Sequence, residues 1–123
     1  MAYSGWEIDE QSRADLLTLF VPTYPDVIAH HVTAQRGVPA DAQPPEHADI
    51  QIIGHVCRDG VEALVVEVNG SKDRPYGGVY HITWSIDRAA GAKPVHSNDL
   101  IREHGYVPIA LRAPVKTTPK VFY

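Results

Sequence analysis

The sequence lacks the features that would place the chain in a membrane or among disulfide-stabilised proteins. Its 123 residues include a single cysteine, Cys57, which cannot form an internal disulfide or supply a thiolate zinc site. No apolar run approaches the roughly 18–20 residues that cross a bilayer. The segment from Met1 to Glu7 has neither a basic start nor an apolar stretch, so we expect no secretory signal. These absences favour a reducing, cytoplasmic setting.

An excess of positive charge is also missing. Eleven Lys and Arg residues against fifteen Asp and Glu residues give a formal net charge of -4. This charge argues against a protein that holds long nucleic acids by non-specific attraction, but it is compatible with a small, locally positive pocket for one phosphate. Ten prolines and nine glycines show no period, which excludes a collagen-like or low-complexity chain. The length suits one domain, over residues 1–123, with one core.

Hydrophobic periodicity and turn residues predict both helices and strands. The expected helices are 9–20 and 97–104, the second capped by Ser97 and ended by Gly105. The expected strands are 27–36, 48–58, 61–68, 78–87 and 106–112, with a hairpin turn at 59–60 between the second and the third. Segments 37–47 and 69–77 are expected to be loops, and the tail 113–123 is expected to be irregular.

Seven histidines are many for so short a chain, and histidine is a common acid-base catalyst and metal ligand because it titrates near neutrality. Two of them begin H-x-T triplets, His31-Val-Thr33 and His81-Ile-Thr83, within predicted strands. Residues i and i+2 share one face of a strand, so each histidine lies beside its threonine. Two such strands side by side would present two imidazoles and two hydroxyls on one concave surface.

These groups suit the hydrolysis of a phosphodiester. One imidazole can activate water while the other protonates the leaving oxygen, and the sequence does not say which does which. The hydroxyls of Thr33 and Thr83 can donate hydrogen bonds to the non-bridging oxygens, where negative charge grows in the transition state. We therefore predict His31, His81, Thr33 and Thr83 as catalytic residues, in a reaction that requires no metal or other cofactor.

The two triplets resemble the signature of the 2H phosphoesterases, which is a pair of H-x-[ST] motifs on separate strands of one domain. The surrounding segments 24–33, 80–85 and 94–101 look like the small bacterial branch associated with RNA-repair proteins. The resemblance implies an α+β fold with two small antiparallel sheet lobes around a central cleft and flanking helices. It also implies hydrolysis of a cyclic phosphate or a related phosphodiester, such as a 2',3'-cyclic phosphate on an RNA end or a small nucleotide.

Four further residues are candidates for binding the substrate. Lys72, Arg74 and Tyr76 lie in the loop before the second triplet, where a cation can reach a phosphate and a ring can stack on a base. Tyr24 precedes the first triplet and could stack in the same way. The alternative is a solvated turn for the loop and a core position for Tyr24. His30 lacks a threonine partner, so we expect a structural histidine on the strand face opposite to His31.

Two other functions stay open from the sequence. A metal ion could be bound if His30, His55 or an acidic residue joined His31 and His81. The chain could also be a nucleotide-binding module without catalysis. In each case the expected partner is a small molecule, either a nucleotide or the phosphate of an RNA end, and not a membrane. The sequence does not decide the oligomeric state.

Overall fold

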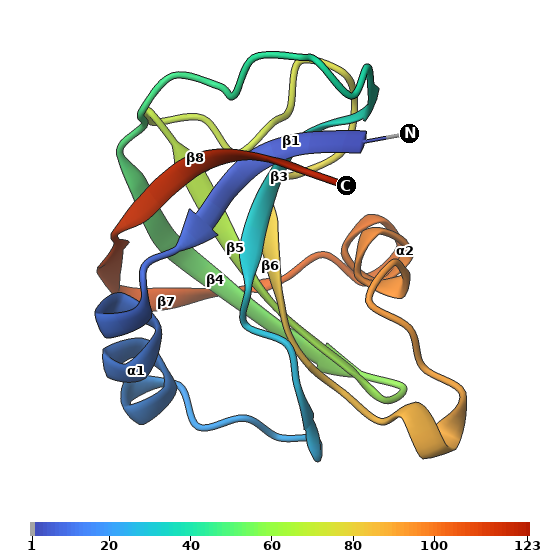
Figure 1. Cartoon of the computed structure of the whole chain (residues 1–123). Helices are drawn as coiled ribbons and strands as arrows, with labels where there is room; N and C mark the ends of the chain where they lie inside the picture. Colours follow the sequence, from blue (N-terminus) through green and yellow to red (C-terminus); the bar gives the residue numbers. More distant parts are fainter. Residues whose placement is uncertain (1) are drawn as a thin grey trace.

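Two antiparallel sheets, whose strands come from distant parts of the chain, make up the protein (Figure 1). The computed structural model describes residues 2–123. The smaller sheet has the strand order β3 (His31–Val38), β1 (Ala2–Ile8), β8 (Thr117–Phe122). The larger sheet has the order β2 (Asp26–Val27), β6 (His81–Ile86), β5 (Val61–Val68), β4 (Ile50–Arg58), β7 (Val107–Val115). Two helices, α1 (Glu10–Leu19) and α2 (His96–His104), and a short 3-10 turn (Arg88–Ala90) complete the α+β fold.

Strand β5 is the centre of the larger sheet because its side chains are apolar on both faces. Leu64 and Val66 belong to the main core together with Val32 of the smaller sheet, while Ala63 packs with Ile101 of α2 on the other face. All four of these β5 and β3 side chains are fully buried. Burial at about 25 cal/mol per Å² of apolar surface makes this double-sided strand a large contributor to stability.

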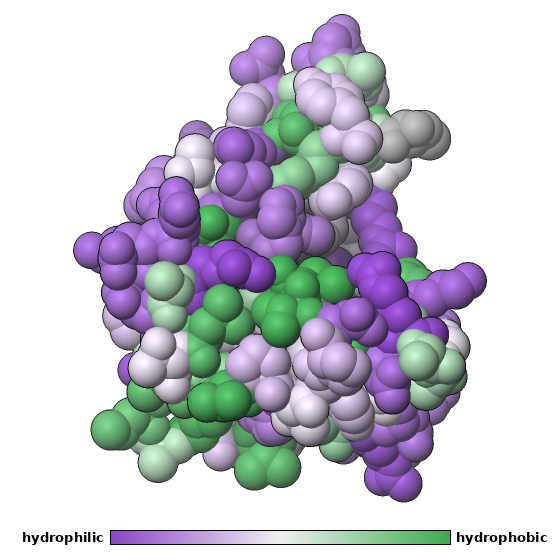
Figure 2. All heavy atoms as spheres, turned by 60° about the horizontal axis from the view of Figure 1, so that its bottom comes forward, coloured by the Kyte–Doolittle hydropathy of each residue, from purple (hydrophilic) through white to green (hydrophobic). Residues whose placement is uncertain are grey.

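Several exposed hydrophobic side chains lie at the C-terminal end of α1 and on the edge strand β7. Leu19, Val21, Val107 and Leu111 are all well exposed. Figure 2 shows one face of the molecule, on which hydrophobic residues (green) gather mainly in the lower left and the centre among hydrophilic ones (purple). Within residues 2–123 no helix is both long enough and apolar enough to span a membrane.

The predicted helices and most predicted strands are confirmed within a few residues, but the predictions for the tail, for the cap of α2 and for strand 27–36 are wrong, and one strand was not predicted. The tail 113–123 is not irregular, because most of it forms the end of β7 and all of β8. Residues 2–8 form β1, for which no strand was predicted, and this strand pairs with both β3 and β8. Ser97 is not the cap of α2, since that helix begins one residue earlier and its first turn has no side-chain cap.

The predicted strand 27–36 is two strands in different sheets. Asp26 and Val27 pair with β6, and the backbone amides of Ile28 and Ala29 continue this contact by donating to Trp84 and Thr83 carbonyls at 2.9 and 3.0 Å. The chain then bends at Ala29 and enters the smaller sheet as β3. This crossing brings β3 into contact with β6, so the two H-x-T triplets lie on neighbouring strands of different sheets.

Candidate active site

A cavity of about 610 Å³ opens between the two sheets, and both H-x-T triplets line it. His31 and Thr33 reach it from β3, and His81 and Thr83 reach it from β6. The middle residues, Val32 and Ile82, are fully buried in the main core on the other side of their strands. The period-2 geometry of a strand therefore places the four polar side chains as the sequence pattern predicted.

His81 has a fixed orientation because its ring is bonded to the backbone. Its Nδ1 lies 2.8 Å from the carbonyl oxygen of Val79. A carbonyl only accepts, so Nδ1 carries the hydrogen and Nε2 has a free lone pair in the neutral ring. Burial lowers the pKa of His81 to about 4; the bond to Val79 opposes this shift, whereas the nearby charges of Arg74 and Arg36 add to it. His81 is thus a neutral base at pH 7.

His31 is held by its neighbours in a different way. Its ring lies among Tyr3 and Phe122, with centroid separations of 5.3 and 5.0 Å. Its Nδ1 lies 3.1 Å from Nδ1 of His30 rather than from a backbone carbonyl. Burial lowers the pKa of His31 to about 4, the neighbouring charges of His30, His81 and Arg36 lower it further, and Glu7 opposes the shift. Both cavity imidazoles are therefore neutral at pH 7.

The cavity is suited to an anion. Arg36, Arg74 and Lys93 line it, and no acidic side chain is among its lining residues, all of which belong to the described part of the chain. This local positive charge contrasts with the net charge of -4 for the whole protein. Guanidinium groups bind phosphate oxygens through short, charge-assisted hydrogen bonds. The cavity thus combines two bases, two hydroxyls and three cations.

Arg74 is the best positioned of these cations. Its Nε donates to the carbonyl of Gly77 at 3.1 Å, and its Nη2 donates to Oδ1 of Asn98 at 2.9 Å. Both partners are neutral, so the charge of Arg74 is not cancelled by a carboxylate. Gly78 makes room for this arrangement, since a Cβ at that position would lie 2.5 Å from Nη2 of Arg74, and its φ of +83° favours glycine.

The hydroxyl of Thr83 is already engaged at the start of α2. Its Oγ1 donates to the carbonyl of Pro94 at 3.2 Å and lies 2.9 Å from Oγ of Ser97, which is fully buried. A hydroxyl has one hydrogen to donate, so a phosphate oxygen in the cavity must displace the Pro94 contact to receive it. The hydroxyl of Ser97 can donate a hydrogen bond to Oγ1 of Thr83 during this exchange.

Three of the four predicted binding residues lie outside this cavity. Lys72 forms an ion pair with Asp73 at 3.2 Å and lines a different hollow, beside Glu67 and Arg112. Tyr76 is 73% exposed in the loop, and Tyr24 accepts a hydrogen bond from the amide of Gly60 at 3.2 Å through its hydroxyl. Only Arg74 joins the triplets, because the loop folds so that its arginine turns inward.

The sequence reasoning missed several residues that line the cavity. Tyr3 comes from β1, which was not predicted as a strand, and Lys93 comes from the segment before α2. His30, which lies beside the cavity, was expected to be a buried or semi-buried residue on the face opposite to His31, but its side chain is 50% exposed and its ring contacts that of His31. The doublet of adjacent histidines was the only signal of this contact in the sequence.

The alternative set of metal ligands does not come together in this fold. His55 is bonded through Nε2 to Oε2 of Glu62 at 2.8 Å, in a third hollow that also includes Phe20 and Ile109. Among residues 2–123 we find no group of three or more His, Cys, Asp or Glu side chains placed to share an ion. The arrangement in the main cavity is that of two imidazoles with cations and hydroxyls.

Comparison of the chain with protein-family models, with curated proteins and with solved structures finds no match. The functional argument therefore depends on the geometry and chemistry of the cavity.

Proposed function

We propose that this protein is a 2H-type phosphoesterase that hydrolyses a cyclic phosphate or a related phosphodiester by two-histidine acid-base catalysis. The observation that carries the proposal is the meeting of His31, Thr33, His81 and Thr83 in one cavity whose lining is basic and not acidic. The two sheets and their flanking helices would then be the two lobes of a minimal 2H-like fold.

The proposed reaction needs only groups that the cavity provides. A water oxygen forms a bond to phosphorus while one imidazole accepts its proton, and the bond to the leaving oxygen breaks while the other imidazole supplies a proton. Negative charge grows on the non-bridging oxygens, where Arg74 and the threonine hydroxyls can stabilise it. The products are a phosphomonoester and a free hydroxyl.

A small nucleotide is the substrate that this cavity favours. Its volume of about 610 Å³ lies within the range of small-molecule sites, roughly 300–1,000 Å³. Tyr3 provides an aromatic wall, stacked on Phe122 at a centroid separation of 4.9 Å, against which a base can lie. We propose a nucleoside 2',3'-cyclic phosphate, free or at an RNA end, acted on in the cytoplasm.

The direct test is hydrolysis of adenosine 2',3'-cyclic phosphate by the purified protein in excess EDTA. Acid-base catalysis contributes about 10²–10⁴-fold, so His31→Ala and His81→Ala should each reduce kcat by at least about 100-fold. His47, an exposed loop histidine, provides the matched control, and His47→Ala should retain full activity. Activity that survives both cavity substitutions, or that disappears with EDTA, contradicts the proposal.

A second function, nucleotide binding without turnover, is favoured by one observation. Because both cavity imidazoles have a pKa of about 4, the free protein at pH 7 holds two neutral rings and lacks a charged acid. Such a cavity could bind an anion without cleaving it. Binding of the cyclic nucleotide, measured by calorimetry, with no product after prolonged incubation would support this second function.

A further inference from the structure

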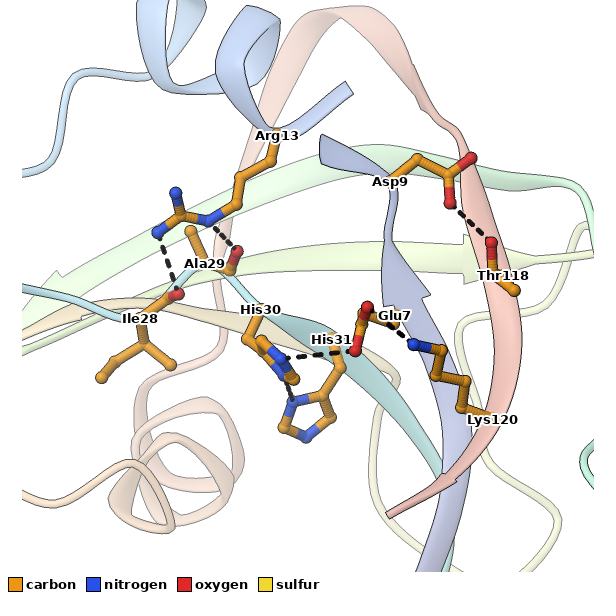
Figure 3. A network of polar contacts seen from close by, with 9 residues as sticks. All are labelled: Glu7, Asp9, Arg13, Ile28, Ala29, His30, His31, Thr118 and Lys120. Carbon is orange, nitrogen blue, oxygen red and sulfur yellow. Dashed lines mark hydrogen bonds and ion pairs between the residues drawn. The ribbon is translucent and has the colours of Figure 1, made fainter. Parts of the chain in front are cut away.

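The contact between His30 and His31 depends on an unusual backbone conformation. Ala29 has a φ of 43°, in the left-handed region that residues other than glycine rarely adopt, and it is fully buried. Arg13 of α1 holds this bend, because its Nε donates to the carbonyl of Ala29 at 2.8 Å and its Nη2 donates to that of Ile28 at 3.5 Å (Figure 3).

The bend explains why two adjacent histidines meet. Successive residues of a regular strand point to opposite faces, so their side chains do not touch. His30 lies just before β3, directly after the bend, and its carbonyl accepts from the amide of Ile8 at 2.9 Å. Its ring therefore turns alongside that of His31, with the two Nδ1 atoms 3.1 Å apart.

A row of ionisable groups continues from His30 toward solvent (Figure 3). Nε2 of His30 lies 3.6 Å from Oε2 of Glu7, and Oε1 of Glu7 pairs with Nζ of Lys120 at 3.0 Å. A carboxylate beside an imidazole stabilises its charged form. The row thus runs from an ion pair at the surface, through His30, to the ring that lines the cavity.

We propose that His30 is a positioning and proton-relay residue for His31, which makes His31 the general acid and His81 the general base. This assignment rests on the proposed phosphoesterase function. The two triplets alone do not show which histidine is the acid and which is the base, because the two motifs are equivalent in sequence.

The hydrogen-bond partners of the two rings carry the assignment. The carbonyl of Val79 forces the hydrogen of His81 onto Nδ1, which leaves Nε2 free to accept a proton from water. His31 faces a nitrogen that can donate, so its own Nδ1 can accept while its Nε2 carries the hydrogen. In Figure 3 the second nitrogen of His31 lies on the side of the ring away from His30.

The proton transfers balance over one turnover. As the leaving oxygen separates from phosphorus, His31 gives it the Nε2 proton, and charged His30 passes its Nδ1 proton to Nδ1 of His31. His81 has meanwhile taken one proton from the attacking water. After product release this proton returns to Nε2 of His31 through solvent in the emptied cavity, and the Nδ1 proton returns to His30.

The surrounding groups favour His30, and not His31, as the source of the relayed proton. The cavity ring of His31 faces His81 and Arg36, and its pKa is lowered to about 4 by burial and by these charges. His30 faces Glu7, with Lys120 behind the carboxylate and the ring of Phe122 at 5.8 Å, and its side chain is 50% exposed. The relay thus supplies the charged acid that two neutral cavity rings lack.

The test compares two leaving groups. Adenosine 2',3'-cyclic phosphate expels an alkoxide that needs a proton, whereas 2'-deoxyadenosine 3'-(4-nitrophenyl phosphate), which has no neighbouring hydroxyl to attack phosphorus, expels a stable phenolate that does not. His30→Gln keeps an N–H group near His31 but cannot store a proton. It should lower kcat for the cyclic phosphate by about 10–100-fold, with KM within about twofold, and lower kcat for the nitrophenyl ester by less than about threefold. His81→Ala should reduce kcat for both substrates alike.

Three outcomes overturn the relay. In the first, His30→Gln leaves kcat unchanged. In the second, His30→Gln lowers kcat equally for both substrates. In the third, it is His81→Ala that lowers kcat for the cyclic phosphate and leaves kcat for the nitrophenyl ester unchanged. If His30→Gln unfolds, Glu7→Gln provides a second variant that removes the charge behind His30, with the same expected substrate difference. Wild-type protein that hydrolyses neither substrate overturns the proposed function itself, whereas an active wild type without the difference overturns only the relay.

Discussion

At the scale of single residues, the most informative side chain is that of Arg74, which lies in the loop before β6 and lines the cavity. Arg74 bonds only neutral acceptors, Gly77 and Asn98, whereas the side chains of Arg58, Arg102 and Arg112 are paired with carboxylates, as Arg102 is with Asp99 at 2.8 Å. A fixed guanidinium without a counter-ion is costly for folding and useful for binding an anion. The charge of Arg74 is therefore available to a phosphate.

We expect Arg74→Met to weaken phosphate binding. A hydrogen bond to a charged group contributes about 1.5–3 kcal/mol, so the inhibition constants of adenosine 2'-monophosphate and adenosine 3'-monophosphate, the two products that ring opening can give, should rise by roughly 10–100-fold. Loss of the cation should also raise the pKa of His81, because Arg74 contributes to lowering it. Arg102→Met on the exposed part of α2 is the control and should change neither quantity. An unchanged inhibition constant contradicts the role of Arg74.

At the scale of elements, the buried carboxylate of Glu62 on β5 holds the segment between α1 and β2 in place through hydrogen bonds. Glu62 is 3% exposed and accepts bonds from the amide and hydroxyl of Thr23, at 2.9 Å each, and from the hydroxyl of Ser85 at 2.7 Å. Nε2 of His55 provides a fourth bond at 2.8 Å. Burial alone would raise the pKa of Glu62, but the bonds from Ser85, Thr23 and His55 outweigh it and lower the pKa.

Glu62→Gln should destabilise the protein by about 1–3 kcal/mol, because it replaces the charge-assisted hydrogen bonds from Thr23, Ser85 and His55 with weaker neutral ones. Urea denaturation at pH 7 measures this change. Glu103→Gln, on the exposed end of α2, is the control and should stay within about 0.5 kcal/mol of wild type. A Glu62→Gln variant as stable as the control would show that the carboxylate does not fasten this segment.

The elements also show how far the sequence could predict the site. The strand face on which the H-x-T side chains lie could be predicted, because strand alternation is a local property of the backbone. The inward turn of Arg74, and the outward positions of Lys72 and Tyr76, depend on glycine conformations and on Asn98, which is distant in sequence. The His30 contact was missed because the positive φ of Ala29 interrupts the alternation that places neighbouring side chains on opposite faces.

At the scale of the whole molecule, the two ends of the chain complete the wall of the cavity. β1 is the middle strand of the smaller sheet and lies between β3 and β8 (Figure 1). It contributes Tyr3 to the cavity wall and Glu7 beside His30, while Phe122 of β8 packs against Tyr3 and His31. Neither strand could be predicted with assurance from local pattern, because each depends on pairing between residues more than one hundred positions apart, such as Tyr3 with Phe122. The pattern of the two H-x-T triplets is local, but the cavity that encloses them is a property of the complete fold.

The two cavity histidines should also make the stability of the fold depend on pH. In the unfolded chain a histidine has a pKa near 6.5, whereas burial holds those of His31 and His81 at about 4. Between these values the unfolded chain binds more protons than the folded one. The free energy of unfolding is therefore highest above about pH 6.5 and falls as the pH decreases toward 4.

When the pH is lowered from 7 to 5, each of the two histidines should decrease the free energy of unfolding by about 1–2 kcal/mol, since one pKa unit corresponds to about 1.4 kcal/mol. The test is urea denaturation at both pH values for wild type and for His31→Gln/His81→Gln. The double variant should lose markedly less stability over this interval, and His47→Gln should behave as wild type. Glu62 does not account for the difference, because its lowered pKa confines its own loss of stability to more acidic conditions. Equal losses in wild type and double variant would mean that the two rings are not held neutral in the folded cavity, and the need for a relay through His30 would disappear with them.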